Sequence, residues 1–214
     1  MAILATDAFT RANAADLGAN WTRMPGVAAG EELGIQGNAA DVVTASTDCG
    51  DRYSAISWPN DQYSKATISN LASSLGVMAR CATSGATKNF YAGGNNVNEF
   101  GGLTTDIHLW KVVAGVVTQL GSTGAGILAI GDTVEIRAQG TTITLLVNGV
   151  SKVTATDSAH ATGAAGLMAL HTFVNLAIWD NWEGGDFVDG QPTMRRWGGV
   201  PGMSPGPALK GRTW

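Results

Sequence analysis

The chain has 214 residues, of which 44% are apolar and 14% charged, values typical of a folded domain with one core and not of a disordered protein. Its net charge of −4 argues against a general nucleic-acid-binding protein, which is normally basic. No apolar run approaches the roughly 18 residues that span a membrane, so we expect no membrane segment. The first residues lack the basic and apolar regions of a secretory signal, and we expect synthesis in the cytoplasm.

Charge and composition change near residue 187. Residues 1–187 carry 9 basic and 16 acidic side chains, whereas residues 188–214 carry 4 basic and 1 acidic. The second segment also holds 4 of the 6 prolines and 6 glycines, too many for a regular core element. We therefore predict a folded domain over residues 1–187 and a Gly/Pro-rich basic arm over residues 188–214.

Apolar and polar residues alternate along most of the first segment, which is the pattern of strands with one buried face. Asn148-Gly149 predicts a hairpin turn because both residues tolerate a positive φ. Residues 12–17 are where we expect one helical turn, capped by Asn13. In chain order, the predicted strands are 63–68, 76–81, 90–91, 107–113, 116–120, 133–139, 141–147, 150–155, 166–171 and 174–182, with a turn at 93–96.

These elements predict an all-β fold of ten to thirteen strands without an internal repeat. An antiparallel two-sheet sandwich accounts for them better than a barrel or a propeller.

Four segments, in order, resemble concanavalin A-like lectin/glucanase sandwiches of the laminin-G-like branch. They are residues 7–21 (opening strand), 34–38 (second strand), 132–150 (a strand–turn–strand hairpin ending in Asn-Gly) and 180–183 (closing strand). The resemblance implies a jelly-roll-like sandwich in which the closing strand pairs near the first.

Residues 107–121 are most similar to the versions of this fold carried by tailed-phage structural proteins, and residues 194–214 resemble the C-termini of phage virion proteins. The resemblance implies a non-enzymatic virion structural protein, in the capsid or the tail, that forms a homo-oligomer on the particle. We expect the arm to anchor it to other virion proteins, with a flexible tail as the alternative. The residues expected to dock are Arg195, Arg196, Trp197, Met203, Leu209, Lys210, Arg212 and Trp214.

Two other functions stay open on the same fold. The first is a carbohydrate-binding module or host-surface adhesin that binds a cell-surface glycan through aromatic side chains and nearby amides. Its candidate residues are Trp58 and Tyr63, then Tyr91 with Asn95 and Asn96, and Trp110. Large aromatic residues more often fill a core, so exposure of their rings distinguishes sugar binding from packing.

The second alternative is a glycoside hydrolase, which needs two carboxylates about 5–10 Å apart. The glucanase branch usually carries Glu-x-Asp-x-(x)-Glu on one strand, and this sequence has no such run. Glu31 and Glu32 would face opposite sides of a strand, as would Asp180 and Glu183. The histidines at 108, 160 and 171 lie in unrelated segments and predict no nucleophile triad. We therefore expect no enzymatic activity.

Metal sites and a disulfide are the remaining questions that the sequence raises. Calcium requires several oxygen ligands, and the candidates, Asp48, Asp51, Asn95, Asn96, Asn98 and Glu99, have no Asp-x-Asp-x-Asp run. We interpret them as turn-stabilising residues and predict no metal or cofactor. Cys49 and Cys81 would pair if their strands are neighbours, although two buried free thiols are the simpler expectation.

Overall fold

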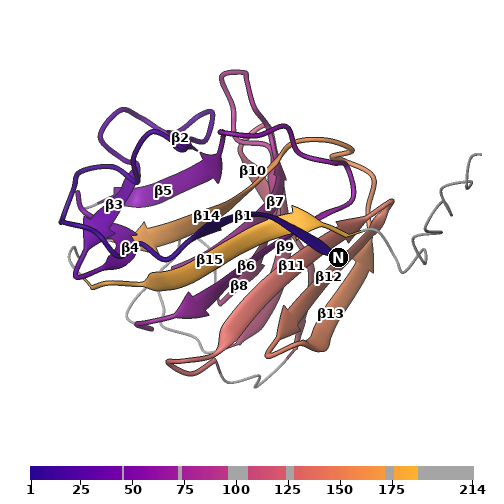
Figure 1. Cartoon of the computed structure of the whole chain (residues 1–214). Coiled ribbons are helices and arrows are strands. Elements are labelled where there is room, and N and C mark those ends of the chain that lie inside the picture. The colour runs from indigo at the N-terminus through magenta and orange to yellow at the C-terminus, as the bar shows by residue number, and fades with distance from the viewer. Residues whose placement is uncertain (45, 72–73, 96–105, 124–127, 172–175, 188–214) are drawn as a thin grey trace, which may run out of the picture.

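The computed structural model describes residues 1–44, 46–71, 74–95, 106–123, 128–171 and 176–187. These residues form fifteen strands in two antiparallel sheets, with no helix among them, which confirms the predicted all-β sandwich (Figure 1). None of them builds a helix long and apolar enough to cross a membrane. Outside the described residues lie the arm, with its eight predicted docking residues, and Asn96, Asn98 and Glu99.

One sheet has eight strands. Seven follow the order β13-β12-β11-β6-β15-β4-β3, and β1 pairs with β15 outside this order. In Figure 1 the first strand accordingly lies beside the last one. The strands are β1 (Ala2–Asp7), β3 (Leu33–Gln36), β4 (Ala39–Val42), β6 (Gln62–Ile68), β11 (Thr133–Gln139), β12 (Thr142–Val147), β13 (Val150–Thr156) and β15 (Trp179–Asp186).

The other sheet has seven strands in the order β10-β9-β8-β7-β14-β5-β2. Its central strands β7 and β14 carry long runs of buried residues because both of their faces are covered. The strands are β2 (Trp21–Arg23), β5 (Ser46–Tyr53), β7 (Ser74–Cys81), β8 (Phe90–Gly94), β9 (Ile107–Val113), β10 (Val116–Thr123) and β14 (Ala164–His171).

The structure corrects three local predictions. Gly93 lies within β8 and not in a turn, because its missing side chain leaves room for Leu145 of the facing sheet; a Cβ there would come within 2.4 Å of Leu145 Cδ1. Residues 12–17 form no helical turn, since Ala14 exchanges two backbone hydrogen bonds with Ile35. The last strand begins at Trp179 and not at residue 174.

Apolar side chains gather in two clusters. The larger one fills the space between the sheets, and the smaller one lies on the outer face of the seven-stranded sheet, where Met24 and Val27 cover Met78 and Met168. Cys49 belongs to the inner cluster and Cys81 to the outer one. The two thiols therefore sit on opposite faces of one sheet, and they form no disulfide with each other.

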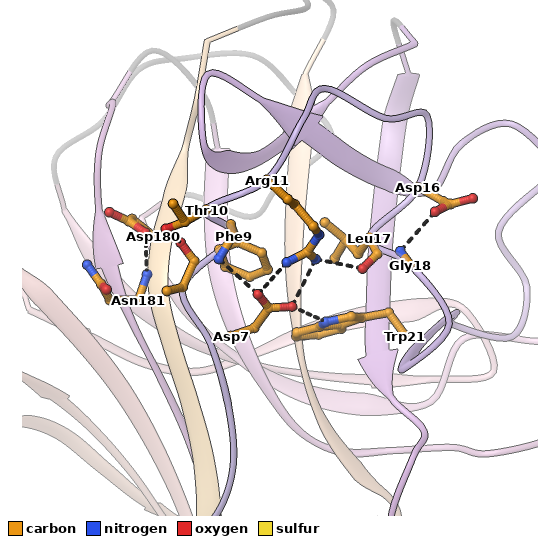
Figure 2. Close-up of polar contacts among 11 residues, drawn as sticks. Asp7, Phe9, Thr10, Arg11, Asp16, Leu17, Gly18, Trp21, Asp180 and Asn181 are labelled. Carbon is orange, nitrogen blue, oxygen red and sulfur yellow. Dashed lines mark hydrogen bonds and ion pairs between the residues drawn. The ribbon is translucent and has the colours of Figure 1, made fainter.

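The Asp7 carboxylate joins the first strand to the chain that follows it (Figure 2). It accepts hydrogen bonds from the Phe9 amide at 2.8 Å, from the Trp21 indole nitrogen at 2.8 Å, and from both terminal nitrogens of Arg11. Arg11 also donates to the Leu17 carbonyl at 2.7 Å. The segment resembling the family's opening strand is thus held by one carboxylate with four donors.

Candidate functional site

A pocket opens at one end of the sandwich, where the neighbouring strands β5, β14 and β7 meet their connecting loops. It has a volume of about 560 Å³ and lies between the loop after β5, the loop after β7 and the start of β14. Trp58 and Arg52 both line it, and we call it the Trp58 pocket. Five serine and threonine residues also line it: Ser54, Ser57, Thr83, Ser84 and Thr162.

Among the predicted sugar-binding residues that the structure describes, Trp58 is the one that lines this pocket. Its indole nitrogen donates to the Tyr53 carbonyl at 2.8 Å, and its ring meets Tyr53 and Trp182 edge-on, with centroids 6.4 and 6.2 Å away. Gly184 lies directly beneath the ring, where a Cβ would come within 2.5 Å of Trp58 Cη2. The half-buried ring is therefore fixed in orientation by the core below it.

Arg52 is the second-last residue of β5 and lines the pocket. Cys49 and Tyr53 of the same strand face the core, so alternation directs Arg52 to the outer face of the sheet. Its Nη2 donates to the Thr83 carbonyl at 3.1 Å, which links the strand to the β7–β8 loop. The sequence gives little signal for this role, because the loop that receives the hydrogen bond is 31 residues away.

The other predicted sugar-binding residues do not form an exposed platform. Tyr63, Tyr91 and Trp110 are 2%, 0% and 7% exposed, and Asn95 is 3% exposed. The polar atoms of three of them serve the fold: the Tyr63 hydroxyl donates to Glu183 at 3.1 Å, the Tyr91 hydroxyl to Asp157 at 2.7 Å, and Asn95 Oδ1 accepts from the Leu75 amide at 2.6 Å. The Tyr91 ring packs in the inner apolar cluster and the Trp110 ring in the outer one, as large aromatic side chains usually do.

A second pocket, of about 440 Å³, lies next to the Asp7 network and is acidic. Asp16, Glu32 and Asp51 line it together with Arg23, which pairs with Glu32 at 3.3 Å. Figure 2 shows Asp16 at this side of the network, accepting from the Gly18 amide at 2.8 Å. The sequence does not predict this meeting of carboxylates, because residues 16, 32 and 51 come from three separate segments.

Two carboxylates of the acidic pocket have pKa values shifted in opposite directions. Burial raises the pKa of Asp51 to about 7, despite a hydrogen bond of 2.7 Å from the Leu33 amide. Burial would also raise the pKa of Glu32, but hydrogen bonds from its own amide, the Gly30 amide and Arg23 hold that pKa below its ordinary value. Environments that separate two pKa values in this way recur in acid–base sites and in structural ion-pair networks.

His108 and His160 line neither pocket. His160 donates from Nε2 to the Val112 carbonyl at 2.8 Å, and burial lowers its pKa. His108 stacks on Trp110 with centroids 5.4 Å apart. The side chains of His171 and Asp48 lie outside the described part of the chain. Within that part, no group of three or more His, Cys, Asp or Glu residues is arranged to hold a metal ion.

Comparison with known proteins identifies the architecture. No protein-family model matches the chain, and no curated protein matches its sequence. The structure is similar to the carbohydrate binding module CBM66 from Bacillus subtilis, with a TM-score of 0.53 and 13% identity, covering 80% of this chain and 95% of that one. It is also similar to the Bacillus licheniformis β-glucanase, with a TM-score of 0.51 and 14% identity, covering 84% of this chain and 92% of that one.

A third similar structure is the GH43 protein BlXynB from Bacillus licheniformis, with a TM-score of 0.56 and 11% identity. The match covers 85% of this chain and 39% of that one. Identities this low show the fold alone. The chain has the antiparallel jelly-roll sandwich of concanavalin A-like lectins, glucanases and carbohydrate-binding modules.

Proposed function

We propose that this protein is a non-catalytic carbohydrate-binding module and that the Trp58 pocket is its sugar subsite. The observation that carries the proposal is the Trp58 ring, fixed at the wall of a pocket that five serine and threonine residues also line. A sugar ring has an apolar C–H face that stacks on an aromatic ring and hydroxyl groups that exchange hydrogen bonds with serine and threonine. A concave site with few convergent polar groups is the usual form of a small-ligand site.

The similar structures support this proposal through their architecture. One of them is named as a carbohydrate binding module, and it matches this chain over nearly its whole length. The Trp58 pocket is also free of carboxylates among its described lining residues, whereas glycoside hydrolysis requires two.

The binding test uses the full chain and immobilised or soluble polysaccharides of several backbone types. We expect Trp58→Ala to reduce retention at least tenfold and Trp58→Phe to restore part of it, because the smaller ring keeps a stacking face. Thr162→Ala should weaken binding less, while Ser122→Ala, an exposed hydroxyl on β10, provides the matched control. Thermal unfolding of each variant separates loss of the site from loss of the fold. Equal retention of wild type and Trp58→Ala would contradict the proposal.

A glycoside hydrolase is the second candidate, and the separated pKa values of Asp51 and Glu32 favour it. Against it, Glu32 Oε2 already accepts from Gly30 at 2.8 Å and from Arg23 at 3.3 Å, so this carboxylate is committed to the fold. Assays of reducing-end release from the bound polysaccharides distinguish the candidates. We expect no release above a heat-inactivated control; release that disappears in both Asp51→Asn and Glu32→Gln would establish the hydrolase instead.

The virion role predicted from the sequence receives no support from the comparisons and stays a prediction. Its anchor, residues 188–214, lies outside the described residues. Deleting residues 190–214 from the full chain tests it, because the sandwich strands all precede residue 187. If the arm is the anchor, the shortened protein should keep its thermal unfolding midpoint and no longer co-purify with phage particles that lack the native copy.

A further inference from the structure

Arg52 differs from the other described arginines in having no carboxylate partner. The remaining four each form an ion pair, with N···O distances between 2.5 and 3.5 Å: Arg11 with Asp7, Arg23 with Glu32, Arg80 with Asp61 and Arg137 with Glu135. Among the described residues, the one hydrogen bond of Arg52 goes to the Thr83 carbonyl. Its positive charge is therefore not neutralised within the described structure.

The guanidinium of Arg52 is nevertheless held in place. Nη2 is bound to Thr83, and Nε is buried without an acceptor among the described residues. Nη1 makes no hydrogen bond among the described residues, and it is not one of their buried unsatisfied atoms. This nitrogen is therefore accessible. A guanidinium fixed by its strand and by one carbonyl loses little further freedom when it binds a ligand.

The charged residues that line the two pockets are mostly of opposite sign. Arg52 is the sole charged residue among the described residues that line the Trp58 pocket. The acidic pocket holds three carboxylates, and its one arginine, Arg23, is already paired. Of the two, the Trp58 pocket alone therefore presents an unpaired positive charge, although the whole chain carries a net charge of −4.

The geometry points to a carboxylated sugar, of the uronic acid class, as the ligand of the Trp58 pocket, with Arg52 pairing with its carboxylate. This inference rests on the proposed function, since Trp58 supplies the stacking face for the same sugar ring. Guanidinium and carboxylate are matched in shape, and charge-assisted hydrogen bonds between them are about twice as strong as neutral ones. An acidic glycan would supply the counter-charge that every other described arginine finds within the fold.

The test compares two polymers with the same backbone, polygalacturonate and its fully methyl-esterified form, as ligands of the full chain. We expect the acidic polymer to bind at least tenfold more tightly at low salt, with the preference falling as NaCl is added. Arg52→Gln should remove the preference, measured as the ratio of the affinities for the acidic and the esterified polymer, while Arg52→Lys retains part of it. Arg137→Gln, an arginine whose partner is Glu135 on the other sheet, is the matched control.

Four outcomes separate this inference from the proposed function. Equal binding of both polymers, or a preference that survives Arg52→Gln, overturns the acidic-sugar assignment while Trp58-dependent binding still supports the module. Equally tight binding of a sulfated polymer of the same backbone overturns the assignment to carboxylates. Absence of any Trp58-dependent glycan binding overturns both. Arg52-dependent preference for polygalacturonate over the ester and the sulfated polymer supports the inference.

Discussion

The indole nitrogen of Trp58 donates a hydrogen bond of 2.8 Å to the carbonyl of Tyr53, which ties a loop residue to the last residue of β5. The Trp58 ring also rests on Trp182, and Trp182 in turn packs against Trp21 with centroids 4.6 Å apart. The wall of the Trp58 pocket is therefore continuous with the aromatic part of the core. Substitutions beneath this wall should change the pocket as well as the stability of the fold.

Gly184→Ala tests this coupling. Its added Cβ would lie 2.5 Å from Trp58 Cη2 and 2.9 Å from Trp182 Cζ2, so one of the rings must shift. We expect the free energy of unfolding to fall by about 1–3 kcal/mol, as overpacking usually costs. We also expect several-fold weaker glycan binding, measured on protein that remains folded at the assay temperature.

Gly121→Ala is the control for that substitution. Its Cβ would lie 2.7 Å from Val153 Cγ1, a comparable clash with a side chain, but between β10 and β13. Stability should fall by a similar amount while glycan affinity stays at the wild-type value. Equal loss of affinity in both variants would show that binding responds to stability in general and not to the position of Trp58.

Asp7→Ala should be among the most destabilising single substitutions. It would leave the Trp21 indole nitrogen and the Phe9 amide without their acceptor, at a cost of about 3 kcal/mol in chemical denaturation at pH 7. Asp7→Asn retains one acceptor oxygen and should cost less. Wild-type stability after Asp7→Ala would contradict the role assigned to this carboxylate.

The contribution of Asp7 should also depend on pH. Burial would raise its pKa, but hydrogen bonds from Arg11, the Phe9 amide and Trp21 outweigh burial and lower it. A carboxyl group with a lowered pKa in the folded state stabilises the protein above its unfolded-chain pKa, near 3.8. This stabilisation is lost as the pH falls through the folded-state value, so wild type and Asp7→Asn should converge in stability as the pH falls below 3.8 and through that lower value.

The sequence predicts the strands of this protein better than its site. Alternation locates β9 and β11 to the residue, because each has one face on the core and one on solvent or on a covering loop. Gly93 is an exception, because its segment predicts a turn, yet it lies within β8 and makes room for Leu145 of the other sheet. Gly184 lies beyond residue 182, where the predicted last strand ends, yet it belongs to β15 and makes room for Trp58.

The pocket residues are harder to predict for a similar reason. Trp58 is recognised by its type, whereas Arg52 gains its role from loops and strands that meet it only after folding. In the sequence, Tyr91 and Trp110 are equally suited to bind a sugar, but in the structure both are buried. The sequence shows which residues have the right chemistry, but which of them reach a surface depends on long-range strand pairing.

Asp51 gives the last prediction, in which stability decreases as the pH rises. Burial raises the pKa of Asp51 to about 7, whereas the unfolded chain has a value near 3.8. Between these two values the unfolded state is ionised and the folded state holds the proton, so unfolding becomes easier with increasing pH and levels off above about pH 7. Asp51→Asn removes this dependence and retains an oxygen for the Leu33 amide. Relative to wild type, we expect it to gain stability between pH 4 and pH 8, by at most about 4 kcal/mol.

Asp16→Asn, which changes an exposed carboxylate of the same pocket, is the matched control for removing a negative charge. Parallel pH profiles for wild type and Asp51→Asn in chemical denaturation would show that Asp51 is ionised in the folded protein throughout this range.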